Sequence, residues 1–80
     1  ITSAGHLVPT ADDTYDLGTA SLQWRNVYTG DLHLSNMTKN VGNNVDGTKG
    51  DWTIQEGAED LFLLNNNTGK KYKFNLMEVK

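Results

Sequence analysis

The chain has 80 residues, of which 36% are hydrophobic and none is cysteine, and its formal net charge is -3. A chain of this length buries only about 60% of its unfolded surface, and disulfides are excluded, so we expect oligomerisation to stabilise it. The seven Lys and Arg residues form no single basic stripe and no apolar run approaches a membrane span, so neither nucleic acid nor membrane insertion is expected.

The chain is predicted to be one module over residues 1–80, in three parts. Residues 1–36 carry short motifs, residues 37–50 form a polar loop rich in Gly and Asn, and residues 51–80 contain strand-like runs. Because the sequence begins with neither Met nor a recognisable leader, we expect a fragment of a longer protein.

The first part predicts one helical turn and two strand segments. Residues 21–25 follow Gly18 and are expected to form a single helical turn, capped by Thr19 or Ser21. Residues 27–29 and 31–34 have strand-like composition and are separated by Gly30. The helical turn is too short to stand alone and is expected to be held by packing of Leu22 or Trp24.

The third part predicts an antiparallel three-stranded meander over residues 51–55, 60–64 and 71–76. In the last run Tyr72, Phe74 and Leu76 alternate with polar residues, which is typical of a half-buried strand. The middle run is apolar at consecutive positions, Leu61 to Leu64, and therefore needs cover on both faces. A neighbouring subunit is the expected source of that cover.

Several motifs together resemble a pattern that recurs in bacteriophage tail fibres, cyanophage-like ones among them, and in other virion structural proteins. The motifs are Tyr15-Asp16-Leu17-Gly18, Trp24-Arg25 with Tyr28, Gly30-Asp31-Leu32-His33-Leu34-Ser35-Asn36, Gly50-Asp51-Trp52-Thr53 and the turn Asn66 to Lys70. The polar stretch from Met37 to Lys49 is longer than in that pattern.

The resemblance implies a mostly β, intertwined homotrimer in the C-terminal region of a fibre. Its location would be the virion, and its partners would be two further copies of itself, the upstream fibre shaft and a host surface polysaccharide or protein receptor. The residues expected in the trimer core and interfaces are apolar: Leu17, Trp24, Tyr28, Leu32, Leu34, Trp52, Ile54, Leu61, Leu63, Tyr72, Phe74 and Leu76.

The leading hypothesis is a structural, trimerising fibre module that is not an enzyme and needs no cofactor. The alternative is a carbohydrate-recognising receptor-binding domain, since loops on a rigid β frame often carry recognition. Its expected contact residues lie in the polar loop: Asn36, Lys39, Asn43, Asn44, Asp46 and Lys49.

Three other chemical possibilities are ranked lower. Trp24 with Arg25, and likewise Trp52, could bind a sugar, but packing explains such aromatics more simply. Three copies of His33 around a threefold axis could hold a metal ion, yet no second ligand stands at suitable spacing, so no metal is expected. Glu56 and Glu59 could act as the carboxylate pair of a glycan hydrolase, but an exposed turn favours solvated charges.

Overall fold

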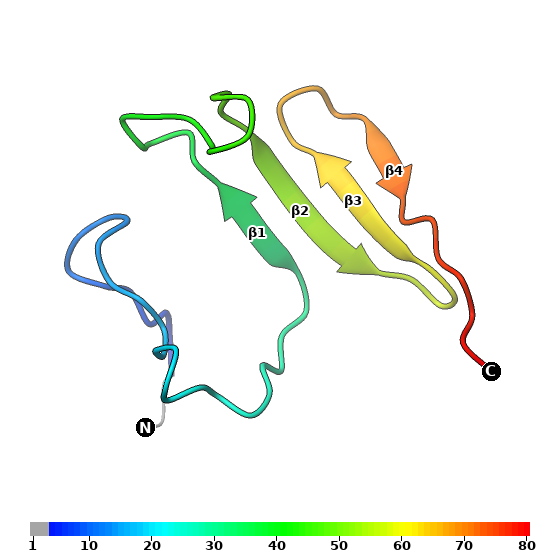
Figure 1. Ribbon diagram of the computed structural model, residues 1–80, viewed down its shortest axis with the longest axis horizontal. Helices are drawn as coiled ribbons and strands as arrows, with labels where there is room; N and C mark the ends of the chain where they lie inside the picture. The colour runs from blue at the N-terminus through cyan, green and yellow to red at the C-terminus, as the bar shows by residue number, and fades with distance from the viewer. Residues whose placement is uncertain (1–3) are drawn as a thin grey trace.

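A computed structural model describes residues 4–80 as a single antiparallel sheet with irregular segments on either side. The four strands lie in the order β1-β2-β3-β4, and this part of the chain contains no helix (Figure 1). Their bounds are β1 (Leu32–Ser35), β2 (Asp51–Glu56), β3 (Leu61–Asn65) and β4 (Lys71–Lys73). The predicted mostly β, antiparallel class and the C-terminal meander are confirmed, and β1 joins the meander as a fourth strand.

Two tight turns set the register of the meander. Between β2 and β3, the Gly57 amide donates to the Asp60 carbonyl at 2.7 Å. A Cβ on Gly57 would lie 2.6 Å from the Phe62 ring, so a larger residue at this position would force the ring to move. Between β3 and β4, the Asn65 side-chain oxygen accepts from the amide of Thr68, and Gly69 adopts a left-handed φ of +77°.

The register places most apolar strand side chains on one side of the sheet, whereas Phe62 and Leu64 lie on the other, so the middle strand is apolar on both faces as predicted. Leu32 faces Ile54, Leu34 faces Trp52, and Ile54 faces Leu63, so these residues share one side of the sheet. We call this side the apolar face, and it comprises Leu32, Leu34, Trp52, Ile54, Leu61, Leu63, Tyr72 and, by alternation beyond β4, Phe74. The Phe74 amide continues the ladder by donating to the Leu61 carbonyl at 3.0 Å.

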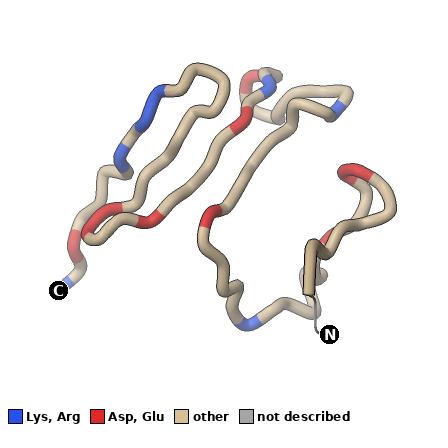
Figure 2. Tube along the Cα trace, turned by 180° about the vertical axis from the view of Figure 1, so that it is seen from behind, with Lys and Arg blue, Asp and Glu red and all other residues tan. Residues whose placement is uncertain are grey.

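The opposite face, called the polar face although Phe62 and Leu64 also lie on it, carries a hydrogen-bond network centred on Thr53. Its hydroxyl lies 3.0 Å from His33 Nδ1 in β1 and accepts from the Asn66 side-chain amide at 2.9 Å. The same amide donates to the Asp51 carboxylate at 3.0 Å. Thr53 is only 3% exposed and is the single buried residue in the described part of the chain. Lys71 and Lys73 follow on β4, where basic residues gather (Figure 2).

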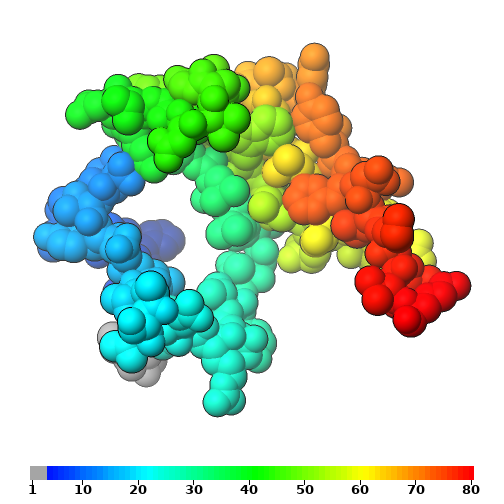
Figure 3. Space-filling model, viewed as in Figure 1, coloured from blue at the N-terminus to red at the C-terminus, as the bar shows by residue number. Residues whose placement is uncertain are grey.

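Residues 4–31, here called the arm, precede the sheet. They lie beside β1 and lead into it, and they do not pack over either face of the sheet (Figure 1). The tip of the arm contacts the chain again after β1. Thr38 Oγ1 donates to the Asp12 carboxylate at 2.8 Å, and Lys39 forms an ion pair with Asp13 at 3.4 Å. The space-filling view shows an opening enclosed between the arm and the sheet (Figure 3).

The predicted helical turn over residues 21–25 is wrong. The Leu22 amide does donate to Thr19 Oγ1 at 2.9 Å, as the capping prediction required. However, the Thr19 amide donates to the Leu22 carbonyl at 2.9 Å, which closes a reciprocal turn instead of starting a helix. One turn of helix fixes several dihedral angles for a single hydrogen bond, and no packing here offsets that cost.

Two strand predictions also need correction. Residues 27–29 are not a strand, because no neighbouring strand lies beside them in the arm. The last strand ends at Lys73 rather than Leu76, since β3, its partner, begins at Leu61 and offers no backbone groups beyond the bond from Phe74.

Candidate functional site

The loop over residues 36–50 is a built structure that closes on Asn36, at the end of β1. The Asn36 side-chain oxygen accepts from the Gly50 amide at 2.7 Å, and its side-chain nitrogen donates to the Thr48 carbonyl at 3.2 Å. The Asn36 backbone amide donates to the Gly50 carbonyl at 3.2 Å. These bonds hold the two ends of the loop together at one end of the sheet, so the loop is preorganised.

A second set of hydrogen bonds, made by the Asn43 side chain, orders the part of the loop farthest from the sheet. The Asn43 side-chain oxygen accepts from the amides of Val45 and Asp46 at 2.8 and 2.9 Å, and its side-chain nitrogen donates to Asp46 Oδ1 at 2.8 Å. Asp46 Oδ1 also accepts from the Thr48 hydroxyl at 2.8 Å. These bonds stabilise the charged carboxylate and lower the pKa of Asp46 below its ordinary value of 3.8, with the Thr48 hydroxyl as the largest cause.

Gly42 allows the loop to close tightly. A Cβ at this position would lie 1.9 Å from the Gly47 carbonyl oxygen, which no side chain tolerates. Gly47 itself has a left-handed φ of +73°. The glycines in this stretch are therefore required by the loop geometry.

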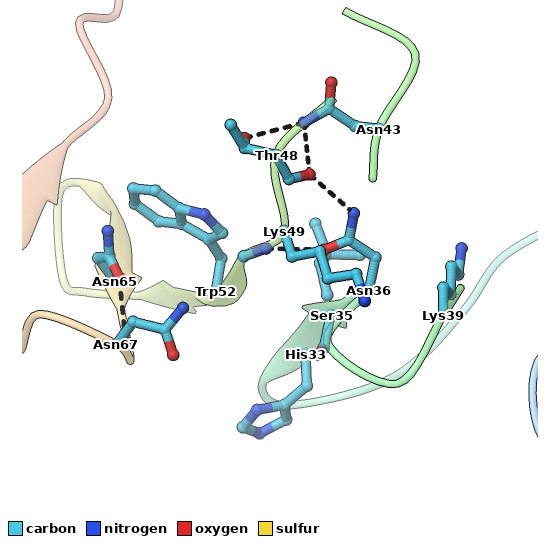
Figure 4. A pocket seen from close by; sticks show the side chains of 12 residues that line it. His33, Ser35, Asn36, Lys39, Asn43, Thr48, Lys49, Trp52, Asn65 and Asn67 are labelled. Atoms are coloured by element: carbon cyan, nitrogen blue, oxygen red, sulfur yellow. Dashed lines mark hydrogen bonds between the residues drawn. The ribbon is translucent and has the colours of Figure 1, made fainter. Parts of the chain in front are cut away.

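Together, the loop, the end of the sheet and the β3–β4 turn enclose an open concavity of about 650 Å³ (Figure 4). Most of the residues that line it are of polar type, and the full set is His33, Leu34, Ser35, Asn36, Lys39, Asn43, Thr48, Lys49, Gly50, Trp52, Asn65 and Asn67. The segments that supply these residues are far apart in the sequence, and the antiparallel register brings them to the same end of the sheet.

The electrostatics of the concavity differ from those of the whole chain. The chain has a net charge of -3, yet the lining contains two lysines and no carboxylate. Lys39 is paired with Asp13 at 3.4 Å, whereas Lys49 has no ion pair or side-chain hydrogen bond to any residue from 4 to 80. A cationic group is therefore available on the concavity wall.

The predicted loop residues divide into two groups. Asn36, Lys39, Asn43 and Lys49 line the concavity, whereas Asn44 and Asp46 do not. Sequence analysis placed neither Asn65 nor Asn67 in a site, considered His33 only as a metal ligand, and assigned Trp52 to the trimer core. The Asn-rich stretch at the β3–β4 turn was visible, but only the strand register could show that it meets the loop.

The residues predicted for the trimer core also divide. Leu32, Leu34, Trp52, Ile54, Leu61, Leu63, Tyr72 and Phe74 share the apolar face. Leu17, Trp24, Tyr28 and Leu76 lie away from it and are exposed in the single chain, Trp24 by 65% and Tyr28 by 92%. Gly18 lies close to the Trp24 ring, so Trp24 packs locally within the arm.

The lower-ranked chemical sites gain no support from the geometry. Residues 4–80 contain no group of three or more His, Cys, Asp or Glu side chains that could hold a metal ion within one chain. His33 Nδ1 is engaged by Thr53. Glu56 and Glu59 lie at the β2–β3 turn, and neither lines the concavity.

No family model, curated protein or solved structure matches the chain. In addition, no helix within the described residues is long and apolar enough to cross a membrane.

Proposed function

We propose that the chain is a structural, trimerising module of a bacteriophage tail fibre, near the C-terminal tip of the fibre and serving host attachment, without enzymatic activity. The motifs from Tyr15 to Trp52 that resemble fibre sequences support the assignment to a virion. The observation that carries the oligomeric role is the uncovered apolar face.

The apolar face lacks a partner within the chain. No hydrophobic side chain is buried in residues 4–80, and no segment of the arm covers the sheet. Leu32 remains 47% exposed, although it stands in a strand and faces Ile54. A contiguous apolar surface of this kind marks an interaction site.

The exposed area supports burial against more than one neighbour. The chain exposes 7836 Å², whereas a compact monomer of its mass is expected to expose about 4,800 Å². The excess, about 3,000 Å², corresponds to about 1,500 Å² for each of two neighbours in a closed trimer, which is the size range of permanent interfaces. Three copies related by a threefold axis satisfy this requirement with one repeated contact.

The test is the solution mass of the wild-type chain and of a Leu32→Asp variant, measured by light scattering. A wild-type mass near three times 8.9 kDa is expected. The variant should dissociate, because an interface would bury the new carboxylate without a partner.

The matched control is Val45→Asp, which introduces the same charge at a loop residue that is 95% exposed. It should keep the wild-type mass. A monomeric wild-type chain, or a Leu32→Asp variant with the wild-type mass, would contradict the proposed use of the apolar face.

A further inference from the structure

We propose that neighbouring copies join edge to edge, with β4 of one copy paired to β1 of the next as an antiparallel strand. The inference rests on the proposed self-association and deepens it, because it assigns a contact surface and a register besides the apolar face. β1 and β4 are the two outer strands of the sheet (Figure 1), and they run in opposite directions because every neighbouring pair is antiparallel. A sheet that continues from one copy into the next therefore stays antiparallel.

The β1 edge carries backbone groups without partners. The Asn36 amide donates to the Gly50 carbonyl at 3.2 Å, and an antiparallel ladder repeats such bonds at every second residue. His33 and Ser35, which lie between the bonded positions, therefore turn their amides and carbonyls away from β2. Figure 3 shows the opening beside β1, so the arm leaves this edge accessible.

The β4 edge is free in the same way. The bond from the Phe74 amide to the Leu61 carbonyl fixes which positions of β4 bond to β3. Lys71 and Lys73 are the alternate positions, so their amides and carbonyls point away from the sheet. No hydrogen bond within residues 4–80 engages these groups. A strand edge of this kind is a template for pairing with another chain.

One register uses all four of these residues. With Ser35 opposite Lys71 and His33 opposite Lys73, each pair brings together an amide and a carbonyl from both copies, so each can exchange both of its hydrogen bonds. All four side chains then lie on the polar face of one continuous sheet.

The same register continues the apolar face across the contact. It places Tyr72 opposite Leu34, and Phe74 opposite Leu32, and such aromatic and aliphatic pairs stabilise a sheet. In the single chain Leu34 is 49% exposed and Tyr72 is 46% exposed. Edge pairing therefore covers part of the surface that the chain itself leaves open.

Charge favours unlike edges over like edges. Lys70, Lys71 and Lys73 have no ion pair in the described part of the chain. Two β4 edges would bring these lysines against one another, which is unfavourable, and lysines on edge strands commonly prevent such pairing. β1 is preceded by Asp31, which lies diagonally across from Lys73 in the proposed register and within reach of its side chain. The contact is heterologous, and three repeats of it close a ring.

The first test is amide hydrogen exchange in the wild-type assembly, followed by NMR and expressed relative to unfolded-chain rates. The amides of His33, Ser35, Lys71 and Lys73 should exchange at least about tenfold more slowly than that of the exposed loop residue Asn44, because each gains a hydrogen bond from a neighbour. Fast exchange of all four amides in a trimer would overturn the inference.

The second test fixes the register with cysteines, which the chain lacks. Leu34→Cys with Tyr72→Cys places two thiols on a pair without direct backbone hydrogen bonds, where Cα atoms lie about 4.5 Å apart. Oxidation should therefore link three chains on a non-reducing gel. Within one chain two strands separate these positions, a distance of about 14 Å that no disulfide spans.

The matched control, Leu32→Cys with Tyr72→Cys, moves one thiol by two residues along the same face and should give little linked trimer. Linkage in the control but not in the test variant would overturn the register. Light scattering of the wild-type chain separates the two proposals. A monomer would refute the proposed trimer, whereas a trimer with four unprotected amides would refute only the edge pairing.

Discussion

At the scale of single residues, asparagine has two distinct uses in this chain. The side-chain nitrogens of Asn36 and Asn43 donate to backbone carbonyls, and their side-chain oxygens accept from backbone amides. These hydrogen bonds hold the loop together in the absence of a hydrophobic core. Asn65 holds the β3–β4 turn with its oxygen and leaves its nitrogen free. The composition predicted turns, but the division between these two uses depends on the folded loop.

Asp46 makes the loop sensitive to acid. Because the pKa of Asp46 in the folded protein is lowered, its contribution to stability is complete above pH 3.8 and is lost as the pH falls from 3.8 through the folded pKa. The amide of Thr48, which donates to Asp46 Oδ1, should shift in an NMR titration with a midpoint below 3.8. Asp46→Asn should abolish this titration, and a midpoint above 3.8 would contradict the assignment.

At the scale of elements, Thr53 links three parts of the sheet. It lies in β2, contacts His33 of β1, and accepts from Asn66 directly after β3. Thr53 is the single buried residue in the described part of the chain although it is polar, because its hydroxyl bonds to both of these neighbours while Leu64 of β3 lies opposite it.

Thr53→Val should destabilise the sheet by about 1–2 kcal/mol, since it keeps the β-branched shape but removes two hydrogen bonds. The measurement is urea unfolding followed by circular dichroism at a fixed chain concentration. Thr29→Val is the control, because Thr29 is exposed in the arm and bonds only to a nearby carbonyl at 3.3 Å. Its effect should stay within about 0.5 kcal/mol, and equal losses in both variants would argue against a sheet-wide role for Thr53.

At the scale of the whole molecule, the single chain is extended. Its radius of gyration is 15.6 Å, while a compact domain of this length is expected to reach about 12 Å. The arm accounts for part of this difference, because it encloses an opening beside β1 (Figure 3). No other part of the described chain covers the apolar face or the arm.

The stability of the assembly should therefore depend on protein concentration. Each tenfold dilution should lower the melting temperature seen by circular dichroism, because dissociation and unfolding are coupled when folded chains need their neighbours. A melting temperature that stays constant over a hundredfold dilution would indicate a chain that is stable alone. Val45→Asp provides the control and should follow the wild-type dependence.

The two strands that the sequence predicted best, β2 and β3, combine strand-forming residues with clear turns at both ends. The predictions that were wrong lie mostly in residues 21–29, where Leu22, Trp24 and Val27 are apolar but remain largely exposed. Short apolar segments carry a weak local preference, and packing decides their conformation. In the candidate site, the loop was predictable and the approach of Trp52, Asn65 and Asn67 was not.

By itself, the sequence determined the antiparallel β class, the turns around Gly57 and Gly69, and the polar character of residues 37–50, because these depend on local alternation and on residues with special backbone freedom. Only the tertiary structure decided that most apolar strand residues share one face while Phe62 and Leu64 lie on the other, and that Lys49 and Trp52 line one concavity. Both features follow from the pairing register, which is set by contacts between segments distant in the sequence and is not encoded in any one of them.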